Sequence, residues 1–227
     1  MQNAVAPASR SGASEQPRGG DANVRSGWQR KHVAIAAAAL VLFARDGYER
    51  TSVDAIAAEA GVSKRTVYSH YGDKENLFLL VLRETHDTMR DRVADIVDRN
   101  LRDVDDMRSA LTTCIREIVR TITRAPERAT LVRLLISEAP HFPAILDLWH
   151  NRGIVPLIAE PLAKLAAAGL LHTDDPAQAA EHLSALTLGQ VSNKSMMGTI
   201  PLSDSEADRI VVSGIAAFMR AYSAAAH

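Results

Sequence analysis

Polar side chains that fall close together at residues 64–70 have the donors and acceptors needed to read the edges of DNA bases. They are Lys64, Arg65, Thr66 and His70. A guanidinium or ammonium group pairs with the N7 and O6 acceptors of guanine, and a threonine hydroxyl bonds to several base edges. Because these side chains surround the apolar Val67 at helical spacing, the stretch predicts a helix that enters the major groove of DNA.

The neighbouring residues predict the elements that hold this helix in place. Thr51 and Asp54 form a capping-box pattern, which starts a helix near Ser52. Gly61 ends that helix, because glycine enters the left-handed conformation at little cost. Ser63 then caps the next helix through its hydroxyl. Two short helices joined by a glycine turn make a helix-turn-helix, whose second helix lies in the major groove.

Residues 31–82 resemble the DNA-binding domain of the TetR/AcrR family of one-component regulators. The matching residues occur in the family's order, namely Gly47, Thr51, Ile56, Ala57, Gly61, Val62, Ser63, Thr66, Val67, Tyr68, Tyr71, Lys74, Glu75 and Leu77. Two positions depart from the family, since Arg65 stands where glycine is common and Tyr71 where phenylalanine is usual. Neither departure threatens the fold, but Arg65 is expected to alter which bases are read.

The resemblance also implies which residues bind the DNA backbone. Phosphate contacts are implied for Thr51, Ser52, Tyr68 and Lys74. The helix N-termini near Ser52 and Lys74 would assist these phosphate contacts. Together with Tyr71 and the four base readers named above, these residues make up the expected DNA-binding set.

Composition favours an all-α protein. Of the 227 residues, 47% are apolar and only 4% are aromatic, and alanine and leucine dominate. The net charge of −1 divides into +2 for residues 1–75 and −3 for the remainder, so the basic surplus lies with the DNA-binding motif.

Composition also bears on the compartment. The single cysteine, Cys114, excludes an internal disulfide and suits a reducing cytoplasm, and its apolar neighbours indicate a buried, inert thiol. The start of the chain lacks the pattern of a signal peptide, and no apolar run reaches the ~20 residues of a membrane span. We therefore expect a soluble cytoplasmic protein without membrane contact, associated with the nucleoid when bound to DNA.

The chain divides into three expected segments. Residues 1–26 are rich in Ala, Ser, Gly, Pro and Arg and should be disordered, either as a solvated start without function or as a basic DNA-binding arm carrying Arg10, Arg18 and Arg25. Residues 27–75 form the DNA-binding domain, and residues 76–227 form a ligand-sensing and dimerisation domain. Helices are predicted over residues 28–45, 74–100, 106–124, 126–139, 144–168, 176–197 and 203–224, with bends at Pro156 and Pro161.

Residues 128–190 are similar to the C-terminal domains of the AefR-like branch of the same family, which implies ligand sensing and dimerisation without identifying a ligand. We expect residues 176–197 and 203–224 to pair with their symmetry mates as a four-helix bundle. The contact faces would be Ala180, Leu183, Leu186, Thr187, Gln190 and Val191, and Ile210, Val211, Gly214, Ile215, Phe218 and Met219. Alternatively, these stripes only cover the core of one protomer.

An apolar effector pocket is expected among the helices from 77 to 194, because proline-interrupted helices around 140–156 leave room for a ligand. Its candidate lining residues are His86, Arg133, Phe142, Trp149, His150 and Asn193. A mainly apolar molecule with one or two polar groups would suit these side chains, and a carboxylate that meets Arg133 stays open.

Other chemistries find little support. The chain has no GxSxG elbow, no glycine-rich phosphate loop and no HExxH, so no catalytic residue and no cofactor are predicted. Glu138 with His141, and Asp147 with His150, have the spacing of some bundle metal sites, but Pro140 separates the first pair and no metal site is expected.

The sequence thus predicts a homodimeric, ligand-responsive transcription regulator, more often a repressor in this family than an activator. Its partners would be a quasi-palindromic double-stranded DNA operator, a small-molecule effector and a second copy of itself. The alternatives are a ligand-independent DNA-binding regulator and, more distantly, a metal-handling helical bundle. An occluded or highly polar centre in the larger domain would favour the ligand-independent regulator.

Overall fold

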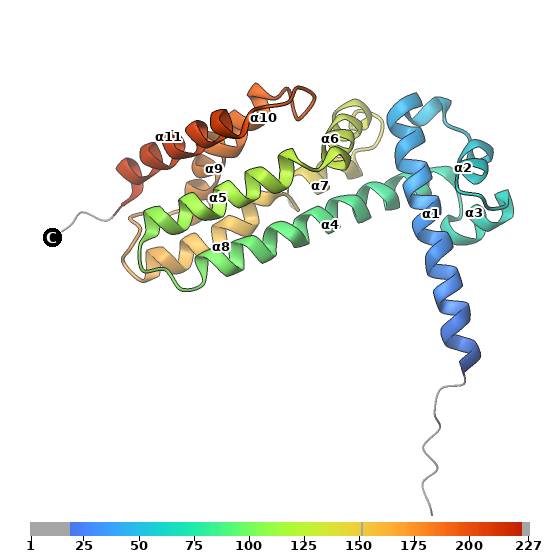
Figure 1. Cartoon of the computed structure of the whole chain (residues 1–227), viewed down its shortest axis with the longest axis horizontal. Coiled ribbons are helices and arrows are strands. Elements are labelled where there is room, and N and C mark those ends of the chain that lie inside the picture. Colours follow the sequence, from blue (N-terminus) through green and yellow to red (C-terminus); the bar gives the residue numbers. More distant parts are fainter. Residues whose placement is uncertain (1–18, 151, 224–227) are drawn as a thin grey trace, which may run out of the picture.

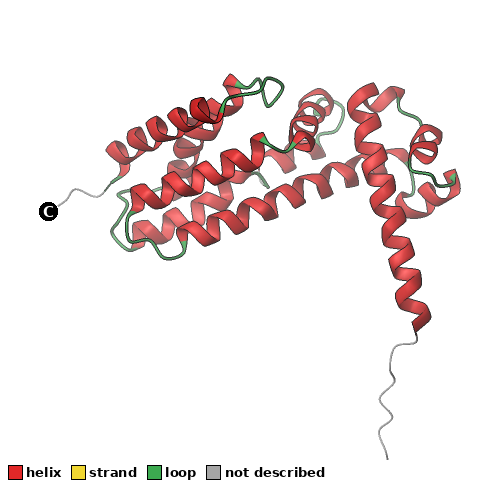
Figure 2. Ribbon diagram, in the orientation of Figure 1, coloured by secondary structure: helices red, strands yellow, loops and turns green. Residues whose placement is uncertain are grey.

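The computed structural model describes residues 19–150 and 152–223, and helices joined by short connections make up this part of the chain (Figure 1; Figure 2). For residues 19–25, 126, 149 and 150 it describes the backbone alone. The α-helices are α1 (Gly19–Arg50), α2 (Val53–Glu59), α3 (Lys64–Tyr71), α4 (Lys74–Leu101), α5 (Met107–Thr123), α6 (Pro126–Glu138), α7 (Ala144–His150), α8 (Ile154–Ala167), α9 (Pro176–Ser184), α10 (Gln190–Lys194) and α11 (Asp204–Tyr222), with a π-helical segment η1 (Ala185–Gly189) between α9 and α10. The predicted all-α fold is confirmed.

The helices α1, α2 and α3 pack with the first turns of α4 into a small head at one end of the molecule (Figure 1). Its fully buried side chains are Ile35, Phe43, Ile56, Val67, Leu77, Phe78 and Leu82. Burying a large apolar side chain contributes about 1.5–3 kcal/mol. This packing stabilises α2 and α3, which have seven and eight residues and are too short to persist alone.

The first helix starts earlier than the sequence predicted. α1 begins at Gly19, so residues 19–26 of the segment expected to be disordered are helical. The rest of that segment, residues 1–18, lies outside the described residues. The proposed basic arm consists of Arg10, Arg18 and Arg25. The side chains of all three lie outside the described residues.

The same helix also runs past its predicted end at residue 45. It continues to Arg50 but passes through Gly47, whose backbone angles (φ 80°, ψ 168°) are not helical. Glycine reaches this conformation without the steric cost that a side chain adds. The kink at Gly47 redirects the chain toward α2.

The second half of α4 packs with α5, α8, α9, η1 and α11 into an elongated bundle (Figure 1). Val93, Leu111, Ile118, Ile158 and Phe218 are fully buried at its centre. The helix expected over residues 144–168 is divided into α7 and α8, and the second of these begins at Ile154 after its N-cap Gly153. Pro156 lies in the first turn of α8, where a missing N–H costs little, whereas Pro161 stays inside the helix.

The helix expected over residues 176–197 is not regular either. The π-helical segment η1 interrupts it where α11 crosses. A Cβ atom placed on Gly214 of α11 would lie 2.2 Å from the carbonyl oxygen of Leu186 and 2.7 Å from Cγ2 of Thr187. The two backbones therefore meet without room for any side chain at Gly214.

The sequence predicted a domain boundary after residue 75. The side chains instead form two hydrophobic clusters whose members do not divide at that residue. The head cluster also contains side chains of α6 and of the α6–α7 segment, namely Leu131, Leu134, Leu135, Phe142, Ile145 and Leu148. The bundle cluster starts on α4 at Met89. By packing, α6 and α7 thus belong with the head, although the sequence placed them in the larger domain.

The faces expected to form a dimer contact are buried inside the protomer. Ala180, Leu183, Thr187, Val191, Ile210, Val211, Gly214, Ile215, Phe218 and Met219 are all buried. Of the predicted set, Gln190 alone is exposed and Leu186 is half-buried. The prediction of these contact faces is wrong, because their apolar stripes cover the core of one protomer.

Candidate DNA-binding surface and effector site

The turn and the second cap of the helix-turn-helix form as the sequence predicted. Gly61 has a φ of +64°, in the left-handed region. The Oγ atom of Ser63 accepts a hydrogen bond from the N–H of Thr66 at 3.1 Å. Val67 is 1% exposed and anchors α3 in the head core. The side chains of Lys64, Arg65 and Tyr68 are left on the exposed side of α3.

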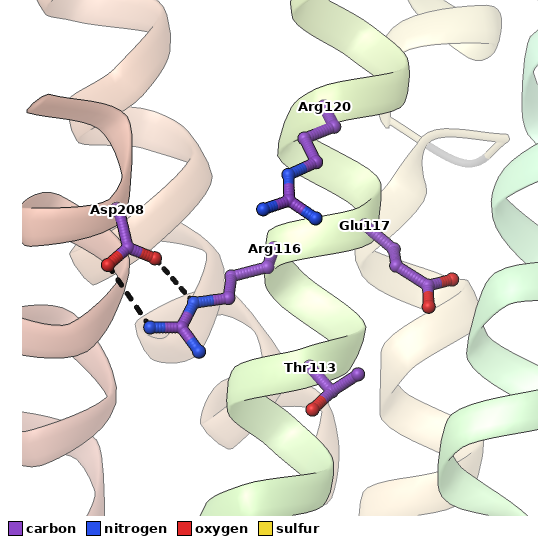
Figure 3. Close-up of a pocket in the computed structure, with 5 residues that line it drawn as sticks. All are labelled: Thr113, Arg116, Glu117, Arg120 and Asp208. Atoms are coloured by element: carbon purple, nitrogen blue, oxygen red, sulfur yellow. Dashed lines mark hydrogen bonds and ion pairs between the residues drawn. The ribbon is translucent and has the colours of Figure 1, made fainter. Parts of the chain in front are cut away.

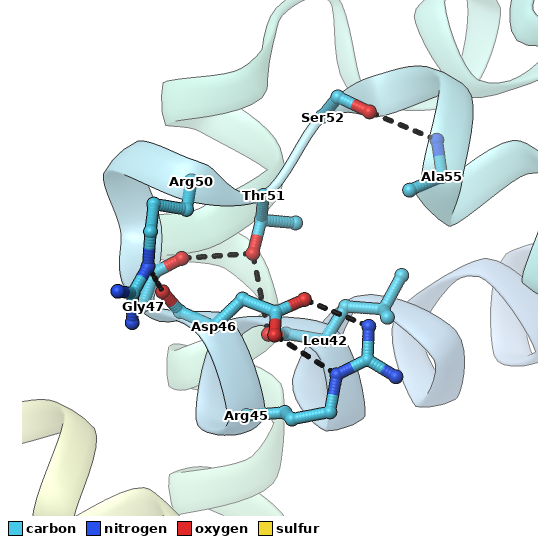
Figure 4. A network of polar contacts seen from close by, with 8 residues as sticks. All are labelled: Leu42, Arg45, Asp46, Gly47, Arg50, Thr51, Ser52 and Ala55. Carbon is cyan, nitrogen blue, oxygen red and sulfur yellow. Dashed lines mark hydrogen bonds and ion pairs between the residues drawn. The ribbon is translucent and has the colours of Figure 1, made fainter.

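Thr51 supports the head from inside and does not cap α2 (Figure 4). It is 3% exposed, and its hydroxyl lies 2.8 Å from the carbonyl oxygen of Gly47 and 3.2 Å from that of Leu42. The cap is Ser52, whose Oγ accepts the N–H of Ala55 at 3.1 Å. The predicted cap is therefore wrong by one residue. The Thr51 hydroxyl is engaged within the fold, while Ser52 stays exposed at the N-terminus of α2.

The exposed side of α3 offers one cation without a partner. The guanidinium of Arg65 has no hydrogen bond or ion pair with any described residue. The ammonium of Lys64 lies 2.8 Å from a carboxylate oxygen of Asp54, and an exposed pair of this kind is weak because water screens it. The Thr66 hydroxyl shares a hydrogen bond with the capping serine. Arg65 can thus meet a base edge without first breaking an ion pair.

His70 and Tyr71 are held against α1 instead of pointing freely to solvent. The His70 ring stacks on Trp28, with centroids 4.6 Å apart, and its Nδ1 is buried without a partner among the described residues. Tyr71 is 4% exposed and donates its hydroxyl to the carbonyl of His32 at 3.1 Å. Burial raises the pKa of Tyr71, whereas burial, followed by His32 and Lys31, lowers the pKa of His70.

These contacts change the expected roles of both residues. A neutral, stacked His70 and a buried Tyr71 fix the end of α3 to α1, so we assign them to positioning and not to DNA contact. The sequence analysis missed Trp28, because it precedes the helix-turn-helix pattern. Its spacing of four residues from His32 was the only available sign that it shares a face with the head.

Lys74 sits at the N-terminus of α4, next to the head surface. Asp73 caps this helix by accepting the N–H of Asn76 at 2.7 Å. The Lys74 ammonium donates to the carbonyl of Glu49 at 3.1 Å and lies 4.3 Å from the ring centroid of Tyr48. One of its three N–H donors is thus used within the protein, and the position combines a fixed cation with a helix N-terminus.

Of the side chains expected to surround an apolar pocket, Phe142, Arg133 and Asn193 are described and do not meet in one place. Phe142 is buried in the head cluster, with its ring centroid 4.7 Å from that of Tyr48. Arg133 is exposed and donates to the hydroxyl of Thr130 at 3.3 Å. Asn193 is exposed at the end of α10. The side chains of Trp149 and His150 lie outside the described residues.

His86 is the polar member of that set that the structure describes as partly buried. It is half-buried on α4 between the head cluster and the bundle cluster, and burial lowers its pKa against the opposing effect of Asp87. Asp87 in turn forms an ion pair with Arg152 at 3.0 Å. One turn further along α4, the Nε atom of Arg90 is buried without a partner among the described residues.

Arg128 on α6 is a further interior cation that the sequence analysis missed. It is half-buried, and burial lowers the pKa of its guanidinium. Leu131 and Val132, one turn later, are each 4% exposed, so Arg128 shares the buried face of α6. Its guanidinium has no hydrogen bond or ion pair with any described residue.

Two hollows on the bundle are lined mainly by polar and charged side chains. One of about 440 Å³ is lined by Thr113, Arg116, Glu117, Arg120 and Asp208 (Figure 3). Inside it the guanidinium of Arg116 points at the Asp208 carboxylate, and the two form an ion pair between α5 and α11 (Figure 3). A second hollow of about 340 Å³ is lined by Arg92, Arg120, Thr121, Arg124, Ala125 and Glu127. Neither is the apolar pocket that the prolines suggested.

Sites for other chemistries are sparse. Across residues 19–150 and 152–223, no three His, Cys, Asp or Glu side chains are grouped so that they could hold a metal ion. Glu138 and His141 approach to 3.6 Å despite the intervening proline, but they form a single pair. Burial raises the pKa of the Cys114 thiol to about 12, which keeps it protonated. Among the described helices, none has the length and apolarity to cross a membrane.

Two family models match the chain. Residues 35–81 match the model of bacterial regulatory proteins of the tetR family. Residues 109–224, about half of the chain, match the C-terminal domain of AefR-like transcriptional repressors. The first match falls on the head, and the second covers the bundle from α5 onward together with α6 and α7.

Comparison with individual proteins points to the same family. The HTH-type transcriptional repressor AcnR of Corynebacterium glutamicum is 30% identical over 139 residues, which span 59% of this chain and 65% of that relative. A solved TetR-family regulator from Mesorhizobium loti is 31% identical, with 86% of this chain and 98% of that chain covered and a TM-score of 0.78. The flavonoid-responsive regulator FrrA is 26% identical, with 87% and 100% covered and a TM-score of 0.62.

The structure and the matches lead to one conclusion. The head contains a helix-turn-helix whose second helix, α3, is exposed, and the larger part of the molecule is all-helical. No part of this conclusion involves catalysis, since the matching proteins are regulators of transcription. The chain belongs to the TetR family of DNA-binding transcriptional regulators and carries an AefR-like C-terminal domain.

Proposed function

We propose that this regulator represses transcription as a homodimer that binds a quasi-palindromic operator and leaves it when a small effector binds. The observation that carries the proposal is the unpaired Arg65 on α3, a short helix fixed at both ends by a serine cap and a histidine–tryptophan stack. Two such heads related by a two-fold axis would read the two halves of the operator. Bound to it, the protein would be associated with the nucleoid.

The expected DNA-binding set divides by its contacts into three groups. Lys64, Arg65 and Thr66 are proposed to read bases, while Ser52, Tyr68 and Lys74 are proposed to bind phosphates. The other members, Thr51, His70 and Tyr71, are engaged inside the head and are proposed to position it. The exposed Ser52 and the fixed Lys74 each lie at a helix N-terminus, which favours an anion.

Lys74→Ala should weaken binding to all duplexes alike, because a phosphate contact carries no sequence information. We expect the slope of log affinity against log salt to fall by about 1, measured by fluorescence anisotropy between about 50 and 200 mM salt. Lys74→Arg keeps the charge and should keep the slope. A loss confined to the operator sequence would show that Lys74 reads bases.

The dimer would use the sides of η1, α10 and α11 that the protomer leaves uncovered. Exposed residues on these sides are Ala185, Gln190, Arg209, Ser213 and Arg220. Small side chains among them let two helices approach closely, and the set differs from the apolar stripes that fill the core. We propose that this outward surface forms the four-helix bundle with the symmetry mate.

Ser213→Arg places a long charged side chain in the middle of the outward surface and should weaken the dimer. Overpacking costs about 1–3 kcal/mol, so we expect roughly a 5–150-fold higher dissociation constant in analytical ultracentrifugation. Ser137→Arg, on the exposed side of α6, is the matched control and should leave the dimer intact. Equal sedimentation of both variants and the parent would place the interface elsewhere.

Effector control would pass through α6, which packs against both α1 and α4. The Glu138 carboxylate at its C-terminal end accepts the N–H of Tyr48 at 3.4 Å, close to the kink that leads into α2. A ligand with a preference of about 1–3 kcal/mol for one arrangement of α6 and α4 would change operator affinity roughly 5–150-fold. The relative FrrA is named as flavonoid-responsive, which supports a small-molecule effector here.

The polar character of the two hollows favours a second candidate, a regulator that binds DNA without an effector. Native mass spectrometry of the purified protein tests the choice, because it reports both the number of protomers on an operator duplex and any small molecule retained. We expect two protomers per duplex and a retained compound that lowers operator affinity. If every preparation of the protein is free of bound small molecules and all preparations bind the operator with the same affinity, the effector-independent regulator is supported.

A further inference from the structure

Trp28 on α1 is the exposed end of an aromatic stack that reaches α3. Its ring lies face to face with that of His70, with centroids 4.6 Å apart, and with that of His32 at 5.3 Å. The side chain is nevertheless 52% exposed, although tryptophan is usually well buried. No described residue accepts a hydrogen bond from its indole N–H. The stack therefore holds a flat ring with an available donor at the surface of the head.

The stack also places this ring beside the reading side of α3. His70 follows Thr66 by four residues, so the two side chains are neighbours along one side of the helix. Thr66 is one of the three residues proposed to read bases. The Trp28 ring thus continues the proposed DNA-binding surface from α3 onto α1.

Lys31 adds a cation to the same face of α1. Trp28, Lys31 and Ile35 follow one another by three and four residues and so share one face, which enters the head core at Ile35. Lys31 is exposed, and its ammonium has no hydrogen bond or ion pair with any described residue. Its charge adds to burial and to His32 in lowering the pKa of His70. Lys31 therefore lies within electrostatic reach of the end of α3.

The charge and the direction of α1 both suit DNA. Residues 22–44 contain Arg25, Arg30 and Lys31 and no Asp or Glu, which favours a polyanion. In the view of Figure 1 the N-terminal half of α1 projects below the head, whereas α11, part of the proposed dimer surface, lies along the upper edge. A second protomer would lie on the α11 side. The projection would then point toward the outer end of each half-site.

We propose that Trp28 and Lys31 bind the sugar–phosphate backbone of the DNA that flanks each half-site on its outer side. This contact rests on the proposed function and adds to it a surface outside the helix-turn-helix. The Lys31 ammonium would pair with one phosphate, and the indole N–H would donate to an oxygen of a neighbouring phosphate. Because backbone contacts carry no sequence information, the flank would contribute affinity whatever its bases are.

The test compares two duplexes that carry the same operator, selected from a random-sequence library. The short duplex ends at the outer edges of the half-sites, and the long duplex adds about half a helical turn, ~5 base pairs, at each end. We expect the full-length parent to bind the long duplex roughly tenfold more tightly. Lys31→Ala and Trp28→Ala should each lose most of this advantage. Lys31→Ala should also lower the salt slope by about 1 per half-site, on the long duplex alone.

Arg30→Ala is the matched control. Arg30 is an exposed cation next to Lys31, but two residues turn it about 200° round the helix from Trp28, onto the opposite face. This variant should keep most of the advantage of the long duplex. Equal losses in Arg30→Ala and Lys31→Ala would show a general effect of positive charge and would overturn the specific contact.

A second readout separates a DNA contact from support of α3. In a Trp149→Phe background Trp28 is the single tryptophan, and the long duplex should shield it from quenching by acrylamide more than the short duplex does. Trp28→Ala would weaken both duplexes equally if Trp28 only held His70 and α3 in place. That result, together with equal quenching in both complexes, would remove Trp28 from the DNA contact.

The binding data also separate this inference from the proposed function. A parent that binds the short duplex as tightly as the long one would overturn the flank contact and leave the operator-binding dimer standing. A parent that binds neither duplex more tightly than unrelated DNA would overturn both. A flank advantage that Lys31→Ala and Trp28→Ala lose and Arg30→Ala keeps would support both.

Discussion

Arg65→Ala should lose discrimination at one base pair in each half of the operator. The exposed guanidinium has no competing partner among the described residues, so its full donor capacity is available to a guanine edge. We expect operator affinity to fall by about 1–3 kcal/mol per half-site. Competition binding with duplexes that carry each base at each operator position would locate the relaxed position.

The control for this prediction is Lys64→Ala. Lys64 neighbours Arg65 on α3, but Asp54 already holds its ammonium, so its removal should cost less. The salt dependence of binding should stay nearly constant in Arg65→Ala, because a base contact neutralises no phosphate. If Arg65→Ala weakened every duplex equally and flattened the salt dependence, its assignment as a base reader would be wrong.

Local chemistry made the head predictable from the sequence. Gly61 and Ser63 act through their own backbone and hydroxyl, so their roles follow from residue type and spacing. The exchange of roles between Thr51 and Ser52 was not predictable in the same way. Both carry a hydroxyl, and the kink at Gly47 decides which one turns inward.

Packing between distant elements was less accessible. The apolar stripes of α9 and α11 indicated burial, but a stripe does not say whether its own protomer or a second copy covers it. The sequence placed α6 in the larger domain because it follows α4 and α5 along the chain. The clusters show that Leu131 and Leu135 of this helix pack with Phe43 and Phe78 of the head.

The cations of α6 show the same limit. The sequence analysis named Arg133 as the cation that a carboxylate would meet, whereas the half-buried cation of α6 is Arg128. Five residues on a helix of 3.6 residues per turn rotate a side chain by about 140°, which moves it from the buried to the exposed face. Only the packing of α6 against α4 fixes that phase, and Arg90 carried no sign of its burial.

Gly214→Ala should destabilise the protein on the order of 2 kcal/mol, because the added methyl group has no space. A Cβ at this position would lie 2.2 Å from the Leu186 carbonyl oxygen, which belongs to backbone and cannot rotate away. Overpacking of this severity costs about 3 kcal/mol, and the better helix propensity of alanine returns about 1 kcal/mol. Urea denaturation followed by circular dichroism measures the difference as a lower midpoint at an unchanged slope.

The opposite sign is expected for Gly189→Ala, a matched glycine in the facing segment. Gly189 is exposed and has helical backbone angles (φ −63°, ψ −44°), and its Cβ would meet only the Ser184 carbonyl oxygen at 3.4 Å. Alanine there should add up to about 1 kcal/mol through helix propensity. Equal effects of the two substitutions would show that propensity governs both sites. Opposite signs would locate the close approach of α11 to η1 at Gly214, and with it the packing that fixes the outward surface proposed for the dimer.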